Sequence, residues 1–548
     1  MTKIKEYTKW IGKLIYRYKF TILALIYIGL IAFLPINLAP SIPMAIHVAS
    51  FLFVLNILAK TKYTFVITFI LAFILTFNAY FAFVLGSDIS LDMMASIFET
   101  HTTEAASMLK GGVVIGGLIA LTTTTLLLWL SEKELKEARL SIKWSLVGLL
   151  IYIFLFLPFV SYKRIAYEYQ EDLFLEFPLR VGQDKVNMYA PILYGNIATI
   201  LAYQEEMAQL RRFADQSSKK LPEGILLSDT VQKPEKIYLV IGESAYRKHL
   251  SLYGYPIKTT PFLDSLAQTT PSSINYYDGI AAAAFTRNAL RIALSFASPT
   301  DMTPFYQEKT LINLANDAGY ETYWLSNQGA SGIQDSYLGY LAAGTDKAVF
   351  TKGGYLANDD FDLIPILKEE HKPGKKQFFI IHLVGSHNNY SDRYDNIDAE
   401  AIPSSGSSLQ TDYDRSIHHT DRVMREIYKV MQQDTTAVFF HFSDHGEILG
   451  KGHGPWKNGI AQYDIPFITI QKNESRINSV MDKYIDPVTK LINNSSTIYV
   501  LAEMMGYIIP QKYVDKSIED GRYVRHSDQS YSPYSEIKEE PEYIKFKY

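Results

Sequence analysis

Five long apolar stretches dominate the first third of the chain. Each is long enough, or nearly so, to cross a bilayer as a helix. Two prolines in NLAPSIP force a break between the first two stretches. No small-residue cleavage site follows the first stretch, so it is not expected to be a removable signal. The predicted spans are 20–38, 42–59, 64–85, 112–130 and 144–160.

Lysine and arginine are distributed unevenly around these stretches. They are frequent before the first stretch, between the second and third, and between the fourth and fifth. Because such residues remain on the cytoplasmic side, the N-terminus is predicted to be cytoplasmic. Five spans then place everything after about residue 161 outside, together with the connection 86–111. That connection carries Glu99, Thr100 and His101.

From Lys236 onward the pattern changes to short apolar runs that alternate with helical stretches. The runs KIYLVIGES, ETYWLSN, KQFFIIHLVGSH, AVFFHFSDHG and PFITIQ are typical of buried strands. Helical spacing appears in 311–319 and 413–433. This alternation predicts an α/β domain with a central, mostly parallel sheet and helices on both faces.

Polar side chains follow three of the predicted strands, in GES, GSH and SDHG. In open α/β sheets, ligands bind beyond the carboxyl ends of the strands. Glu243, Asp444 and His445 are residue types that bind zinc, and His453 follows in a glycine-rich loop. Turn capping is the alternative role for Asp444 and His445. Three such strand ends in one domain favour a metal site.

Thr286 stands at the start of a predicted amphipathic helix. A threonine there can simply cap the helix. The same position also offers a hydroxyl nucleophile beside backbone N–H groups that suit a phosphate. Glu447 is expected to support the metal ligands rather than to bind the ion. His418 and His419 lie inside a predicted helix, where packing is expected and a direct role in the site is the alternative.

Charge and cysteine content narrow the function classes. The formal net charge of −4 argues against a general nucleic-acid binder. The absence of cysteine excludes disulfides, thiolate metal sites and cysteine nucleophiles.

Taken in order, these features resemble the bacterial phosphoethanolamine transferases. The resemblance is carried by the five spans, the external E-T-x-x-x-E-A loop, the G-E-S strand end, the helix-start Thr286, and the G-S-H and S-D-H-G-E motifs. It implies a five-helix transmembrane domain followed by an alkaline-phosphatase/sulfatase-like domain. The expected division is 1–161 for the membrane domain, 162–221 for interfacial helices and linker, 222–525 for the catalytic domain and 526–548 for a flexible or surface-packed tail.

The resemblance also implies an activity: zinc-dependent transfer of phosphoethanolamine from phosphatidylethanolamine to an envelope acceptor, such as lipid A or the lipopolysaccharide core. Transfer would pass through a phosphorylated Thr286. The implied zinc ligands are Glu243, Thr286, Asp444 and His445. His387 and His453 are implied to bind the phosphoryl group or a second ion, and Glu99 and Thr100 to bind lipid substrates.

The implied cofactor is one tightly bound zinc ion, with a second, weaker zinc as an option and manganese as the rival ion. The implied setting is the Gram-negative inner membrane, with the catalytic domain in the periplasm. The chain is expected to act as a monomer and to bind no nucleic acid.

The chain departs from the family pattern at three points. It has no disulfides, it carries His101 where asparagine is usual, and SNQGASG lacks a lysine that several members carry, so substrate contacts there do not carry over. Three alternatives stay open: a phosphoglycerol transferase on the same scaffold, a phosphatase or sulfatase-type hydrolase, and a non-catalytic membrane protein. The sequence does not identify the acceptor molecule.

Overall fold

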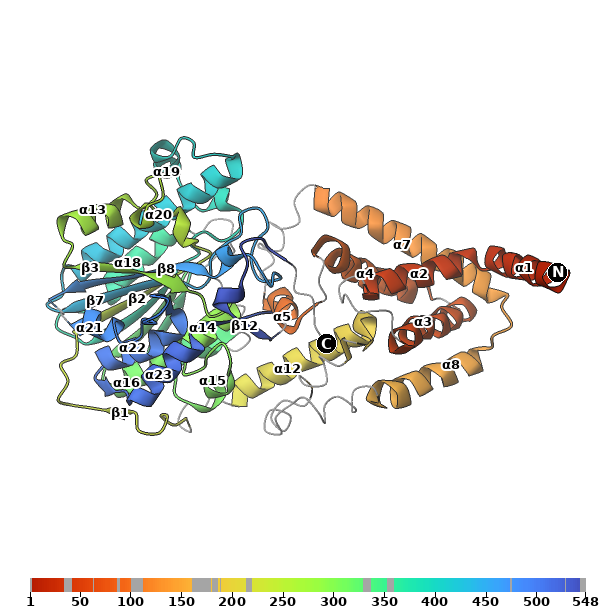
Figure 1. Cartoon of the computed structure of the whole chain (residues 1–548), viewed down its shortest axis with the longest axis horizontal. Coiled ribbons are helices and arrows are strands. Elements are labelled where there is room, and N and C mark those ends of the chain that lie inside the picture. Colours follow the sequence, from red (N-terminus) through yellow and green to blue (C-terminus); the bar gives the residue numbers. More distant parts are fainter. Residues whose placement is uncertain are drawn as a thin grey trace. The chain divides into compact units, whose positions relative to one another are not determined.

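The computed structural model forms two compact units (Figure 1), one within the first 206 residues and one over Met207–Glu542. Each unit is described by itself. The described residues are 2–33, 42–62, 64–85, 89–99, 112–159, 179, 186–187, 189–212, 219–328, 337–351, 359–473, 476–527 and 529–542.

The first unit is helical. Among its described residues, four stretches are long and apolar enough to cross a membrane, and α1 and α2 form a pair, bent by 75°, that could act as a fifth. This confirms the prediction of an N-terminal domain of apolar helices. The last part of the predicted first span, 34–38, lies outside the described residues. The described α-helices that begin in this unit are α1 (Thr2–Arg17), α2 (Lys19–Phe33), α3 (Ile42–Lys60), α4 (Phe65–Tyr80), α5 (Leu91–Glu99), α7 (Gly112–Lys136), α8 (Ile142–Ile151) and α12 (Asn196–Arg212).

The break between α1 and α2 has a local physical cause. The Glu134 carboxylate of α7 accepts hydrogen bonds from the backbone N–H groups of Phe20 and Thr21, at 3.1 and 2.9 Å. These N–H groups lie in the first turn of α2, where no intrahelical acceptor is available. A carboxylate is also favourable at the positive end of a helix dipole. Glu134 therefore fixes the start of α2 against α7.

The second unit is built on a central sheet. Eight strands of its described part form this sheet in the order β5-β4-β6-β2-β7-β8-β3-β9. Only β8 runs against the others, so the predicted mostly parallel sheet is confirmed. The strands are β2 (Lys236–Gly242), β3 (Ile274–Ile280), β4 (Glu321–Ser326), β5 (Lys347–Phe350), β6 (Gln377–His382), β7 (Ala437–Ser443), β8 (Asp464–Lys472) and β9 (Ile492–Asn493).

Helices cover both faces of this sheet (Figure 1). One face packs against α13, α18 and α20 through a continuous apolar core that includes Val240, Phe379, Leu367 and Ile427. The central strands are buried on both faces, which explains their uninterrupted apolar runs. The longer helices of the unit are α13 (Pro261–Thr269), α14 (Thr286–Ala293), α16 (Leu311–Asp317), α18 (Leu363–Glu370), α20 (Ser408–Met431), α22 (Thr497–Met504) and α23 (Gln511–Asp520).

Shorter elements complete the second unit. Two small antiparallel pairs join β1 to β10 and β11 to β12. β12 lies in the region expected as a tail, whose described part therefore packs against the domain. The elements are α15 (Thr303–Gln307), α17 (Tyr337–Ala342), α19 (Asn396–Ala401), α21 (Arg476–Met481), β1 (Leu226–Leu227), β10 (Tyr507–Ile508), β11 (Tyr523–Arg525) and β12 (Tyr531–Pro533).

The register of the central strands decides what lies at their carboxyl ends. Gly242, the last residue of β2, pairs with Ser443, the last residue of β7. The next residue in each strand, Glu243 and Asp444, therefore leaves the sheet at the same level. On the other side of β2, Ile241 pairs with His382 of β6.

The turn after β7 depends on glycine at position 446. Its N–H donates to the Gln462 carbonyl at 2.9 Å, and an added Cβ would lie 2.0 Å from the Ala461 carbonyl oxygen.

We expect Gly446→Ala to destabilise the second unit by roughly 1–3 kcal/mol, as overpacking usually does. The thermal unfolding midpoint of the detergent-solubilised protein measures the effect. Gly116→Ala, where a Cβ meets nothing within 4 Å, is the control; equal midpoints for the two variants would refute the prediction.

Candidate active site

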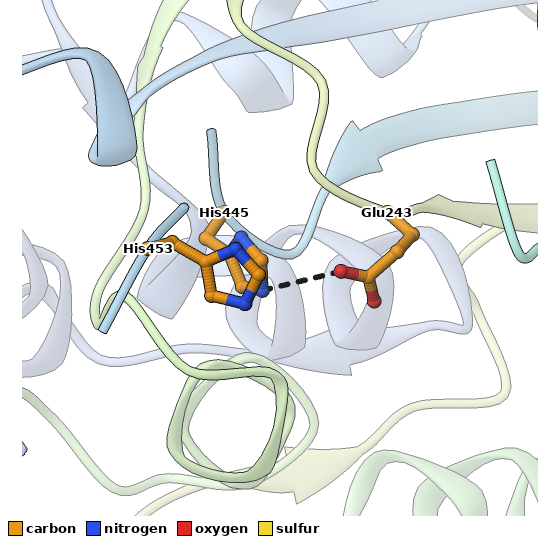
Figure 2. Close-up of side chains that lie close together, drawn as sticks. All are labelled: Glu243, His445 and His453. Carbon is orange, nitrogen blue, oxygen red and sulfur yellow. Dashed lines mark ion pairs between the residues drawn. The ribbon is translucent and has the colours of Figure 1, made fainter. Parts of the chain in front are cut away.

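Five of the predicted site residues meet at the carboxyl ends of β2 and β7. Glu243 follows β2, and Asp444 and His445 follow β7. Thr286 is the first residue of α14, and His453 comes from the loop beyond the β7 turn. Figure 2 shows the Glu243 carboxylate facing the imidazoles of His445 and His453. Residues far apart in the sequence are therefore brought into one site.

The Thr286 hydroxyl lies at the centre of this group. Its Oγ1 is 3.2 Å from Glu243 Oε2 and 3.2 Å from His445 Nε2. His445 Nε2 is in turn 3.3 Å from Glu243 Oε1 and 3.2 Å from Asp444 Oδ2. One ligand atom each from Glu243, His445 and His453 fall within 4.8 Å of one another. This spacing suits a shared cation.

The chemistry of the side chains also fits a metal ion. Asp444 Oδ2 is buried and has no hydrogen-bond donor among the described residues. His445 Nδ1 lies 2.9 Å from the Gly446 carbonyl oxygen, so Nδ1 must carry the proton and donate it. Nε2, which faces the carboxylates, is then an unprotonated ligand atom. Carboxylate oxygen and imidazole nitrogen are common zinc ligands.

The electrostatics of the two carboxylates differ. Burial and, next, the negative charge of Glu243 raise the pKa of Asp444 well above its ordinary value. Burial alone would also raise the pKa of Glu243, but its electrostatic interactions with the nearby imidazoles of His445, His387 and His453 lower that pKa well below its ordinary range. Two carboxylates this close cannot both be charged without compensation. A divalent cation would provide that compensation.

His387 lies in the turn after β6, next to Glu243. The N–H of Ser386 donates to the Glu243 carbonyl at 3.0 Å, which joins this turn to the end of β2. Burial lowers the pKa of His387 to about 4. Its imidazole is therefore neutral near pH 7 and can donate one hydrogen bond and accept another.

Several residues that support the site were not identified from the sequence. Gln328 Nε2 donates to Glu243 Oε2 and to the Leu383 carbonyl, both at 2.9 Å. Ser244 Oγ donates to Glu243 Oε1 at 2.7 Å. Gln328 lies in SNQGASG, a stretch with no motif that would single it out, and Ser244 carried no signal beyond its place in G-E-S.

Glu447 supports His453, in line with its expected position outside the metal ligands. His453 Nδ1 lies 2.7 Å from Glu447 Oε2, and the Tyr390 hydroxyl donates to Glu447 Oε1 at 2.5 Å. Glu447 is 2% exposed. A carboxylate in this position keeps the proton on Nδ1 and orients the ring, so Nε2 of His453 is directed to the site.

The predicted lipid contacts were Glu99 and Thr100, next to His101. Thr100 and His101 lie outside the described residues, and Glu99 is described only as the last residue of α5.

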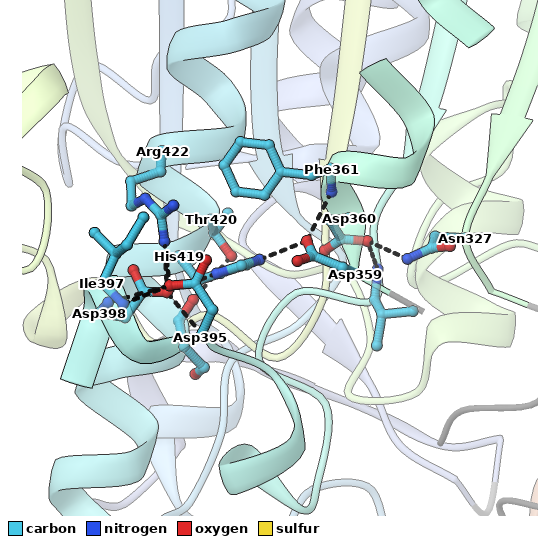
Figure 3. Close-up of polar contacts among 12 residues, drawn as sticks. Asn327, Asp359, Asp360, Phe361, Asp395, Ile397, Asp398, His419, Thr420 and Arg422 are labelled. Carbon is cyan, nitrogen blue, oxygen red and sulfur yellow. Dashed lines mark hydrogen bonds and ion pairs between the residues drawn. The ribbon is translucent and has the colours of Figure 1, made fainter. Parts of the chain in front are cut away.

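A second cluster of carboxylates and imidazoles lies around α20 (Figure 3). Asp395, Asp398 and His419 also bring ligand atoms within 4.8 Å of one another. Here, however, Arg422 Nη1 lies 2.8 Å from both Asp395 and Asp398. A protein cation already occupies the position that a metal would take.

The histidines of this cluster are ion-pair partners. His418 Nδ1 lies 2.6 Å from Asp398, and His419 bridges Asp398 at 2.7 Å and Asp359 at 2.8 Å. Burial alone would lower the pKa of His419, but its hydrogen bonds to Asp359 and Asp398 raise it to about 9. The expected packing role is thus an electrostatic one.

Comparisons with known proteins agree with this architecture. Residues 47–174 match the family model "Phosphoethanolamine transferase EptA/EptB", and residues 236–504 match the model "Sulfatase". "Phosphoethanolamine transferase EptC" of Escherichia coli is 25% identical over 386 residues, which cover 66% of this chain and 65% of the relative. "Phosphoethanolamine transferase CptA" of Salmonella typhimurium is 26% identical over 389 residues, with the same two shares. The chain therefore spans just under two thirds of the length of these relatives.

A solved structure extends the likeness to both units. The integral membrane protein lipooligosaccharide phosphoethanolamine transferase A of Neisseria meningitidis superposes with a TM-score of 0.57 at 15% identity. The match covers 88% of this chain and 95% of that one. At this identity the match shows a shared fold.

We expect the stability of the second unit to fall as the pH rises above neutral, partly because of His419. Its pKa is raised to about 9 in the folded protein, from an ordinary value near 6.5. Its stabilising effect is therefore complete below pH 6.5 and is lost as the pH rises through about 9, on the order of 3 kcal/mol in all. Unfolding midpoints from pH 6 to 10 should decline less steeply for His419→Gln and Asp359→Asn than for the wild type. Parallel profiles would contradict this assignment.

We further expect zinc to stabilise the second unit through Asp444. Chelator-treated protein should gain about 2.7 kcal/mol when free zinc reaches about 100 times its Kd. Asp444→Asn removes one charged ligand and should abolish most of the gain in thermal midpoint. Asp486→Asn, a change at a buried carboxylate outside both clusters, should keep it. If zinc stabilises the Asp444 variant as well as the wild type, Asp444 is not a ligand.

Proposed function

We propose that this chain, which belongs through its two matched regions to the phosphoethanolamine transferase family, moves phosphoethanolamine from phosphatidylethanolamine to a cell-envelope acceptor. The observation that carries the proposal is the position of the Thr286 hydroxyl. It lies 3.2 Å from both a carboxylate and an imidazole of the candidate metal site, at the start of a helix. The nucleophile, its activating groups and a phosphate-binding helix end thus coincide.

In the first half-reaction, Thr286 Oγ1 attacks the phosphorus of the donor lipid. The new O–P bond forms as the bond from phosphorus to the diacylglycerol oxygen breaks. The proton lost by Thr286 is transferred to the departing diacylglycerol oxygen. A zinc ion held by Glu243, Asp444 and His445 would, when bound, lower the pKa of the Thr286 hydroxyl and offset negative charge on the phosphoryl oxygens.

His453 is the side chain best suited to move the proton. Its ring lies 3.8 Å from that of His445, centre to centre. Because Nδ1 donates to Glu447, Nε2 can accept a proton from Thr286 and deliver it to the leaving oxygen. The neutral imidazole of His387 is assigned to hold a phosphoryl oxygen from the β6 side.

The second half-reaction reverses the first with a different alcohol. A hydroxyl of the acceptor attacks the phosphorus, the Thr286 O–P bond breaks, and the proton of that hydroxyl passes to Thr286 Oγ1. Lipid A and the lipopolysaccharide core are the acceptor classes we assign. Glu99 and Thr100 remain the proposed lipid contacts.

The same proposal places the protein in the inner membrane, with the second unit in the periplasm and the N-terminus in the cytoplasm. The apolar helices and the distribution of lysine and arginine support this placement. We assign residues 1–161 to the membrane domain, 162–221 to the connection, 222–525 to the catalytic domain and 526–548 to the C-terminal region. One zinc per active monomer is the proposed loading.

Intact-protein mass spectrometry tests the proposal. Full-length protein in detergent is incubated with phosphatidylethanolamine in the absence of an acceptor. We expect the wild type to gain the mass of one phosphoethanolamine group, and Thr286→Ala to gain none. Thr310→Ala is the control, because Thr310 is a buried threonine at the N-cap of α16 and lies outside the site.

The other outcomes identify the alternatives. An adduct that persists in Thr286→Ala would show that Thr286 is not the nucleophile. A wild type that forms an adduct only with phosphatidylglycerol would be a phosphoglycerol transferase. Release of free phosphoethanolamine to water, at a rate that an added acceptor does not change, would identify a hydrolase.

A further inference from the structure

The metal ligand Glu243 is held by two segments that follow neighbouring strands. From β4, Gln328 donates to the Glu243 carboxylate at 2.9 Å. From β6, the turn at Gly385 packs on the Glu243 backbone, where an added Cβ would lie 3.0 Å from both its N and its O atom. Ser386 N donates to the Glu243 carbonyl at 3.0 Å. The position of Glu243 therefore depends on the ends of β4 and β6.

One buried carboxylate joins those two ends. Asp360 Oδ1 accepts hydrogen bonds from Asn327 Nδ2 and from Val384 N, both at 2.9 Å. Its Oδ2 accepts a third from Gly385 N, also at 2.9 Å. Asp360 is 5% exposed. A buried carboxylate that accepts three N–H groups fixes the groups that donate to it.

The turn that carries Asp360 is itself anchored (Figure 3). Asp359 accepts from the Phe361 N–H at 2.9 Å and lies 2.8 Å from His419 Nε2. His419 connects onward to Asp398, which Arg422 also binds. Because His419 and Arg422 belong to α20, this ion-pair network ties the Asp360 turn to the longest helix of the unit.

We infer that Asp360 is a positioning residue for the metal site, acting through Asn327–Gln328 on one side and through the Val384–Gly385 turn on the other. Its side chain accepts from Asn327, Val384 and Gly385, so it acts on Glu243 through these segments. Its role is to keep the Gln328 amide on Glu243 and to hold the turn that carries His387. The second cluster of carboxylates and histidines is then the anchor of this support rather than a second metal site. The inference rests on the metal-dependent transfer proposed above.

Zinc affinity of the full-length, detergent-solubilised protein tests the inference. Chelator-treated protein competes for zinc with a chromogenic chelator. We expect Asp360→Asn to weaken zinc binding roughly 10- to 100-fold, as changes in the hydrogen-bond partners of metal ligands do. With zinc saturating, kcat should fall while KM for phosphatidylethanolamine stays unchanged.

A matched carboxylate controls for stability. Asp486 is also 5% exposed and accepts two backbone N–H groups, from Val488 and Thr489, although it pairs with Arg522 as well. Asp486→Asn should keep the zinc affinity of the wild type. Asn327→Ala removes one of the three donors to Asp360 and should also weaken zinc binding, but by a smaller factor. If Asp360→Asn does not fold, the zinc affinity of Asn327→Ala tests the inference instead.

Two results would overturn this inference without affecting the proposed function. The first is a wild-type zinc affinity in Asp360→Asn or, if that variant does not fold, in Asn327→Ala. The second is a loss of zinc affinity in Asp486→Asn as large as that in Asp360→Asn. A wild-type protein that neither binds zinc nor forms the lipid-derived adduct would instead overturn the proposed function, and this inference with it.

Discussion

The site depends on the approach of two carboxylates that water does not reach. Gly242 and Ser443 are register partners at the ends of β2 and β7, so Glu243 and Asp444 emerge side by side. They are only 1% and 0% exposed. Repulsion between two such groups is strong in a medium of low dielectric constant. Either a proton on Asp444 or a bound cation must relieve it, and the surrounding imidazoles and hydroxyl group are arranged to share a cation.

The backbone next to these carboxylates is strained. Ser244, directly after Glu243, has a φ of +57°, which is unusual for a residue other than glycine. Its carbonyl accepts a hydrogen bond from the Tyr413 hydroxyl at 2.7 Å, and that hydroxyl accepts one from Tyr246 N at 2.7 Å. Tyr413 is fully buried in α20. Strain at the strand end is thus held in place by a rigid helix, as is common at functional sites.

The local features of this site could be predicted, whereas those that depend on tertiary structure could not. The apolar run before Asp444 and His445 is a local pattern, and so is the helix after Thr286. The position of Asp360 beside Val384 and Gly385 depends on hydrogen bonds between segments that no periodicity relates. The antiparallel direction of β8 could not be predicted from the sequence either, because a buried strand has the same composition in either direction. For His419, the helical pattern indicated packing but could not show Asp359 as its partner.

Two clusters among the described residues of this unit place carboxylates and imidazoles within ligand distance, and they differ in charge balance. At Asp395 and Asp398, Arg422 and the raised pKa of His419 supply positive charge from the protein itself. At Glu243 and Asp444, the only ion-pair partner within the described part of the chain is His445, whose proton on Nδ1 points away toward Gly446. Ligand types and distances are alike at both places. The cluster at Glu243 and Asp444 is therefore the one suited to a metal ion, because its negative charge is not balanced by a cationic side chain among the described residues.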